Sequence, residues 1–170
     1  GITITAINPT NGSTLSDLTW VQEWFWGDKG IGIAGHGSNF ASGPSEGFRI
    51  ALDTPADRVT LTFGGFDLFD QAATDIMARV YTAANPNTPV TVALTNGIQG
   101  QYVGVVHYIL NDVSFGNSDI TKVEVFANDP NNQYTWTLLN VGTERYTTGT
   151  GTDTFTYTVT DADGDHTTST

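Results

Sequence analysis

The stretch DTFTYTVTDADGDHTTS, residues 153–169, carries the clearest structural signal in the chain. In its first half Phe155, Tyr157 and Val159 alternate with threonines, so one face of the segment is apolar and the other carries hydroxyl groups. Side chains alternate between two faces in a β-strand, and the pattern therefore predicts a half-buried strand over 154–160.

The same stretch then enters the acidic sequence DADGD. Asp161, Asp163 and Asp165 stand two residues apart, and Gly164 supplies the turn. Carboxylates this close repel one another unless a cation lies between them, and oxygen ligands are those that Ca²⁺ prefers. The glutamate that would complete an EF-hand loop is absent, so other loops or an adjoining module would complete the site; the alternative is a solvated turn. We expect bound Ca²⁺ and, because free Ca²⁺ is abundant outside cells, an extracellular protein.

Short strand-like segments recur along the rest of the chain, separated by clusters of Gly, Pro, Asn and Asp. Helix signals are few, and the one helical candidate is a short piece at 67–74. Many short strands with turns between them predict an all-β fold, a β-sandwich or jelly roll with little helix and with Ca²⁺-binding loops. The predicted strands span 2–7, 47–52, 58–63, 76–82, 91–94, 104–109, 122–127, 134–141 and 154–160.

The chain length of 170 residues suits one domain, or one domain and a fragment of a neighbour. A Thr- and Gly-rich stretch at 142–151 marks a soft boundary. We expect residues 1–142 to form the sandwich, and 143–170 either to complete it or to belong to an adjoining module. Because the chain starts and stops in strand-like or loop sequence, without a signal peptide, we expect a piece of a longer protein.

The composition argues against several classes of function. Eighteen acidic residues against six basic ones give a net charge of −12, which repels nucleic acid and anionic membranes. There is no cysteine and no apolar run of 18 residues, and the three histidines lie far apart. We therefore do not expect an enzyme, with a hydrolase built on an Asp/Glu pair as a remote alternative.

Residues 20–40, WVQEWFWGDKGIGIAGHGSNF, combine aromatic side chains with five glycines. Because Trp24, Phe25 and Trp26 are consecutive, strand alternation sends at least one ring to each face; one ring belongs to the core, and another is available to a ligand. Glycines allow close approach to a ligand backbone. No helix follows the glycines, so a nucleotide-binding loop is excluded. The candidate ligand-binding residues are Trp24, Trp26, Gly30, Gly32, Gly35, His36, Ser38 and Asn39.

Further carboxylates are scattered through the predicted loops. Solvated surface charge is the default for each, but several together suit several Ca²⁺ ions. The loop carboxylates are Asp28, Glu46, Asp67, Asp70, Asp75, Asp112, Asp119 and Asp129. The candidate metal ligands are Asp28, Asp67, Asp70, Asp161, Asp163 and Asp165.

The tail DTFTYTVTDADGDHTTST resembles the closing strand of modules in giant bacterial adhesins of the repeats-in-toxin (RTX) class. Those adhesins are exported by type I secretion and stiffened by Ca²⁺. The stretches WFWGDKGIGIAG, EGFRIALDTPADRVTLTFGGFDLFD and ITKVEVFANDPNNQYTWTLLNV are similar, more loosely, to ligand-binding domains near the distal end of such adhesins. Some of these domains bind a peptide terminus with the help of Ca²⁺, and others bind sugars.

The resemblance implies a Ca²⁺-dependent, monomeric binding module within a longer chain on the bacterial cell surface. It would recognise a peptide or protein terminus in cell adhesion or biofilm formation. A lectin-like module that binds glycans through Ca²⁺ and a structural stalk domain are the alternatives. Neither nucleic-acid binding nor membrane insertion is expected.

Overall fold

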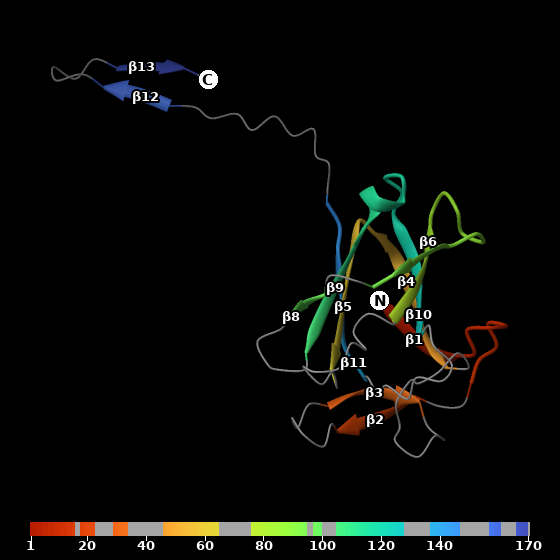
Figure 1. Ribbon diagram of the computed structural model, residues 1–170. Helices are drawn as coiled ribbons and strands as arrows, with labels where there is room; N and C mark the ends of the chain where they lie inside the picture. The colour runs from red at the N-terminus through yellow and green to blue at the C-terminus, as the bar shows by residue number, and fades with distance from the viewer. Residues whose placement is uncertain are drawn as a thin grey trace.

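The computed structural model has an all-β fold built from two antiparallel sheets (Figure 1). It describes residues 1–15, 18–22, 29–33, 46–64, 76–94, 97–99, 105–127, 137–146, 157–160 and 166–169. The five-stranded sheet has the order β1 (Ile2–Ile7), β4 (Gly47–Ala56), β10 (Ile120–Ala127), β6 (Ile76–Thr82) and β7 (Val90–Ala93). The six-stranded sheet has the order β2 (Leu18–Gln22), β3 (Lys29–Ile33), β11 (Thr137–Glu144), β5 (Arg58–Gly64), β9 (Val106–Asn111) and β8 (Ile98–Gln99).

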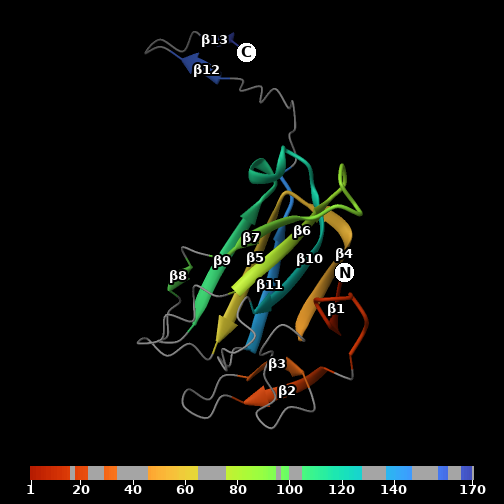
Figure 2. The ribbon, with the colours of Figure 1, turned by 45° about the vertical axis from the view of Figure 1, so that its right-hand side comes forward.

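The core lies between the two sheets, and strand alternation decides which side chains enter it (Figure 2). In β6, IMARVYT, Ile76, Ala78 and Val80 are buried, whereas Met77 and Arg79 are only partly covered. The same alternation holds in β4 from Phe48 to Leu52, whereas in β10 Val123, Glu124 and Val125 are all buried. Fully buried side chains from both sheets form one cluster, which includes Phe48, Ile50, Val59, Leu61, Phe63, Val123, Val125 and Leu138.

Each of the nine predicted strand segments contains a strand, and the bounds predicted for β1 and β6 are those observed. The sequence reasoning missed β2, β3, β8 and β13 (His166–Ser169). Strand β3 and the last three residues of β2 fall within residues 20–40, which we interpreted as an aromatic and glycine-rich segment. The helical candidate at 67–74 lies outside the described residues. Among the residues that are described, the one helical element is the 3₁₀ turn η2 (Asp112–Phe115), and no helix is long and apolar enough to cross a membrane.

The strand predicted at 154–160 is present as β12 (Tyr157–Thr160). It pairs antiparallel with β13, from Tyr157 opposite Ser169 to Thr160 opposite His166. The two strands form a separate two-stranded sheet (Figure 1). In the larger sandwich β11 continues to Glu144, two residues beyond the soft boundary at 142.

Candidate functional site

Three carboxylates meet at one end of the sandwich, which we call the carboxylate end. Asp57 lies in the turn between β4 and β5, Asp112 begins η2 after β9, and Asp119 directly precedes β10. One ligand oxygen from each residue lies within 4.8 Å of the others, and all three side chains are half-buried. This is the only such group of metal-ligating side chains found among the described residues.

Backbone hydrogen bonds hold the three segments together. The Asp57 amide donates to the carbonyl of Glu144 at 3.0 Å, and the Asp57 carbonyl accepts from the Asp112 amide at 2.8 Å. The Asp119 carbonyl accepts from the Ala83 amide at 2.8 Å. The ends of β4, β6, β9 and β11 are thereby tied to the carboxylate end, so its geometry depends on the packing of both sheets.

The 3₁₀ turn ends at Gly116, which brings the chain back toward Asp119. Gly116 has φ of 80°, a left-handed conformation that glycine adopts without the steric cost that other residues meet. The carbonyl of Asp112 then accepts a hydrogen bond from the Asn117 amide at 3.0 Å. The conformation of this turn therefore places Asp112 and Asp119 on either side of one tight loop.

The cluster keeps an excess of negative charge. Arg145 Nη2 lies 3.4 Å from Asp119 Oδ2 on the surface, and the Tyr146 amide donates to Asp57 Oδ2. The nearby Arg58 is engaged elsewhere, because its Nη1 donates to Glu144 Oε2 at 3.2 Å and to the Tyr146 hydroxyl at 3.4 Å. The hydrogen bond with Tyr146 is the main reason why the pKa of Arg58 is raised. Three carboxylates and one contacting guanidinium leave an excess of two negative charges, which one divalent cation would balance.

The donor set decides which metals suit the carboxylate end. It offers carboxylate oxygens and neither histidine nor cysteine. Hard cations such as Ca²⁺ prefer such oxygens, whereas structural Zn²⁺ sites are built from nitrogen and sulfur ligands. Ca²⁺ takes six to eight oxygen ligands, so backbone carbonyls or waters would complete the shell around these three residues.

The carboxylate end was only partly visible in the sequence. Asp112 and Asp119 belong to the loop carboxylates that we noted without assigning them to a site, and Asp57 was missed. Its signal is the short sequence TPADR between two strongly predicted strands, a position where a polar turn residue is ordinary. Nothing in the sequence indicates that this turn lies beside the loops of Asp112 and Asp119, which follow it by 55 residues or more.

Two of the predicted ligand-binding residues, Gly30 and Gly32, lie in β3, opposite Val21 and Thr19 of β2. Gly30 is buried, and a Cβ atom there would lie 2.7 Å from Cβ of Thr137 and 2.9 Å from Cδ2 of Leu139. Its missing side chain allows β3 to approach β11. The other predicted site residues lie outside the described residues: Trp24, Trp26, Gly35, His36, Ser38, Asn39, Asp28, Asp67, Asp70, Asp161, Asp163 and Asp165.

We call the opposite end of the sandwich the loop end. Several of these residues belong to segments of the chain that join strands at this end. The register places Gly47 opposite Phe126 in the five-stranded sheet, and Thr137 opposite Gly64 in the six-stranded sheet. The segments 34–45, 65–75 and 128–136 therefore join strand ends that lie at this end. Glu46, from our list of loop carboxylates, is buried here directly before β4.

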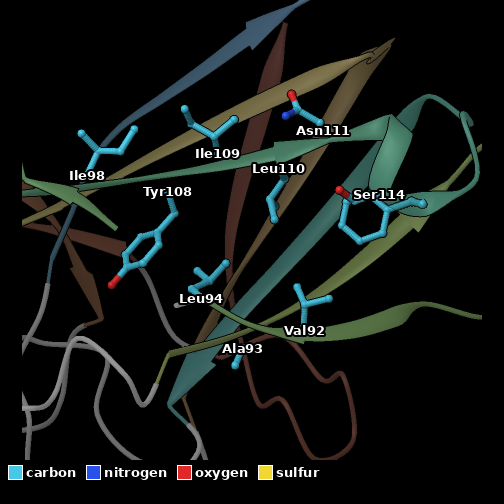
Figure 3. A pocket seen from close by; sticks show the side chains of 10 residues that line it. Val92, Ala93, Leu94, Ile98, Tyr108, Ile109, Leu110, Asn111 and Ser114 are labelled. Atoms are coloured by element: carbon cyan, nitrogen blue, oxygen red, sulfur yellow. The ribbon is translucent and has the colours of Figure 1, made fainter. Parts of the chain in front are cut away.

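An apolar cavity of about 330 Å³ lies between the edge strand β7 and strand β9 (Figure 3). Val92 and Leu94 line it from one sheet, and Tyr108 and Leu110 from the other. Burial raises the pKa of Tyr108 to about 12. A second cavity of about 250 Å³ lies between β1 and β11. Among the described residues no carboxylate or histidine lines either cavity, so neither offers an acid–base pair.

Comparisons of the chain with protein-family models, with curated proteins and with solved structures found no match.

Proposed function

We propose that the chain is a Ca²⁺-dependent binding module of a bacterial surface adhesin, which recognises a peptide or protein terminus in cell adhesion or biofilm formation. The observation that carries the proposal is the carboxylate end, where Asp57, Asp112 and Asp119 converge with an excess of negative charge. The all-β sandwich and the resemblance of the sequence to repeats-in-toxin adhesins support it.

Ca²⁺ at the carboxylate end would act as a brace. It would join the β4–β5 turn, η2 and the start of β10, next to the place where β11 ends at Glu144. An ion that binds the folded state alone raises the free energy of unfolding by mass action. The acidic sequence DADGD would hold a further ion beyond this point of the chain.

Recognition would take place at the loop end. The glycine-containing segment that follows β3, and Asp67 and Asp70 after β5, adjoin strand ends that lie there, whereas Trp24 and Trp26 belong to the segment that joins β2 to β3. A peptide carboxylate could complete the shell of a Ca²⁺ ion held by loop carboxylates, while a tryptophan covers the adjacent side chain. The two ends would then have different tasks, one stabilising and one binding.

Removal of Ca²⁺ is expected to lower the melting temperature. At a Ca²⁺ concentration about 100 times Kd, one site contributes about 2.7 kcal/mol, which corresponds to roughly 5–10 °C for a domain of this size. Differential scanning calorimetry with Ca²⁺ and with a chelator measures the shift. Identical melting curves would contradict the proposal.

A double variant assigns one ion to the carboxylate end. Asp112→Asn with Asp119→Asn is expected to reduce the number of bound Ca²⁺ ions by one in equilibrium dialysis, because amides lack the charge that balances the cation. Asp53→Asn, which changes an exposed aspartate outside the cluster, is the matched control and should leave the count unchanged.

Titration with short peptides tests recognition. Peptides with a free C-terminal carboxylate are expected to bind in the presence of Ca²⁺, and the same peptides with an amidated C-terminus at least tenfold more weakly. A chelator should abolish binding. Equal affinity of both forms, or binding that survives chelation, would refute terminus recognition; retention of glycans instead of peptides would identify a lectin.

A further inference from the structure

The outer face of the five-stranded sheet concentrates positive charge. Arg49 of β4, Lys122 of β10 and Arg79 of β6 are three of the six basic residues in the chain. They point away from the core, because their strand neighbours Phe48, Val123 and Val80 are buried in it. We call Arg49, Arg79, Lys122 and the Glu124 between them the basic face (Figure 2 shows their strands side by side).

Glu124 anchors both arginines of this face. The three residues stand in register across the sheet, with Arg49 and Arg79 on either side of Glu124. Arg49 Nε donates to Glu124 Oε1 at 2.8 Å, and Arg79 Nη1 lies 3.5 Å from Glu124 Oε2. Glu124 is 3% exposed, so both guanidinium groups are drawn close to the sheet surface.

The N-terminal turn fixes the two guanidinium groups further. Arg49 Nη2 donates to the carbonyl of Gly12 at 3.2 Å, and Arg79 Nη1 donates to the carbonyl of Pro9 at 2.6 Å. The guanidinium of Arg79 also lies 4.5 Å from the centre of the Phe126 ring. An anion that binds here would meet side chains that are already ordered, which lowers the entropy cost of binding.

Lys122 adds an unneutralised charge to the basic face. Its Nζ lies 3.6 Å from the centre of the Tyr81 ring, and it has no ion-pair partner among the described residues. The Tyr81 hydroxyl donates to Glu124 Oε2 at 3.1 Å. Burial, followed by the charge of Glu124, raises the pKa of Tyr81, so its hydroxyl stays neutral. Three cations and one anion leave the face with two positive charges on a chain whose net charge is −12.

We propose that the basic face binds an extended acidic segment of a partner protein, with carboxylates at alternate positions. Alternate residues of an extended peptide lie about 7 Å apart, and neighbouring strands about 4.8 Å apart. Carboxylates on one side of such a segment can therefore reach Lys122 and an arginine together. The acidic residues elsewhere on the chain repel the segment little beyond about 8 Å at physiological salt.

The covered aromatic rings favour an acidic peptide over a sugar. Arg79 lies over Phe126 and Lys122 over Tyr81, so cations occupy the ring faces on which a sugar would stack. The basic face is therefore complementary to a ligand through its charge. Arginine can form two parallel hydrogen bonds with one carboxylate, which suits an acidic peptide. This surface lies on the outer face of the five-stranded sheet, and its binding does not depend on terminus recognition.

A peptide blocked at both ends tests the proposal. We expect a labelled, acetylated and amidated Asp-Ser-Asp-Ser-Asp-Ser peptide to bind saturably in fluorescence anisotropy at physiological salt and a fixed Ca²⁺ concentration. Its Asn-Ser counterpart should not bind, and added salt should weaken the complex. Because the peptide has no free terminus, its binding can succeed or fail independently of the proposed recognition of a terminus.

Variants locate the contact. Lys122→Gln, which breaks no ion pair in the described part of the chain, is expected to weaken binding roughly two- to fivefold, the range of one exposed ion pair. Arg58→Gln, on the other sheet, is the matched control and should leave the affinity unchanged, with folding of both checked by urea unfolding. Equal effects of the two variants, binding of the Asn-Ser peptide, or an unaffected affinity of Lys122→Gln would each overturn the proposal. Self-association of the free protein that disappears in Lys122→Gln would replace the partner with a second copy.

Discussion

Replacement of Glu124 by alanine is expected to lower the free energy of unfolding by about 3–5 kcal/mol. The substitution removes the buried carboxylate to which Arg49, Arg79 and the Tyr81 hydroxyl are bound. Both guanidinium groups would remain partly buried beside Pro9 and Gly12 without a counter-charge. Urea unfolding followed by tryptophan fluorescence measures the loss.

Glu144→Ala is the matched control for this substitution. Glu144 also pairs with an arginine, at 3.2 Å from Arg58, but its side chain is 50% exposed. Solvent-exposed ion pairs of this kind contribute at most about 1 kcal/mol. Losses of equal size in the two variants would show that burial does not set the strength of the Glu124 contacts.

Phe48→Ala is expected to cost a similar amount, about 3–5 kcal/mol, through a cavity in the centre of the sandwich. Phe48 is fully buried on β4, between β1 and β10, and belongs to the cluster that joins the two sheets. Strands β4 and β10 are paired on both sides and have little freedom to close the space. Chemical denaturation of the variant and the parent chain gives the difference.

Val113→Ala provides the comparison for the cavity effect. Val113 lies in η2 and is 71% exposed, so its removal should change the free energy of unfolding by no more than about 0.5 kcal/mol. A loss below about 1 kcal/mol for Phe48→Ala would mean that the core relaxes around the missing ring, against the close packing described above.

The sequence predicts strands well where one face of the strand is buried and the other is exposed to solvent. β6 shows this, since its alternation of apolar and polar residues is also its alternation of buried and exposed side chains. β3 shows the limit. Gly30 and Gly32 carry no side chains, so the alternation of apolar and polar residues that marks a strand is missing there. A glycine is required at position 30 because Thr137, more than 100 residues further along the chain, lies too close for a side chain. A local pattern cannot reveal a requirement that a distant strand imposes.

The carboxylate end illustrates the same limit for a site. Single carboxylates in turns are common, and each of Asp57, Asp112 and Asp119 looks ordinary in its own segment. Their convergence follows from the pairing of β5 with β9 and of β4 with β10. The acidic character of the loops was therefore predictable from the sequence, but the convergence of Asp57, Asp112 and Asp119 at one end of the sandwich was not.

The order of strands in the two sheets has a consequence for folding kinetics. The last strands of the sandwich, β10 and β11, occupy interior positions of the two sheets. Their contacts join residues that are 75 positions apart at Arg49 and Glu124, and 86 apart at Arg58 and Glu144. Contacts of such long range require large loops to close first, which makes folding slow. The five-stranded sheet cannot be completed before the chain has been made to residue 127, nor the six-stranded sheet before residue 144, so the nascent sandwich stays incomplete until β11 is available.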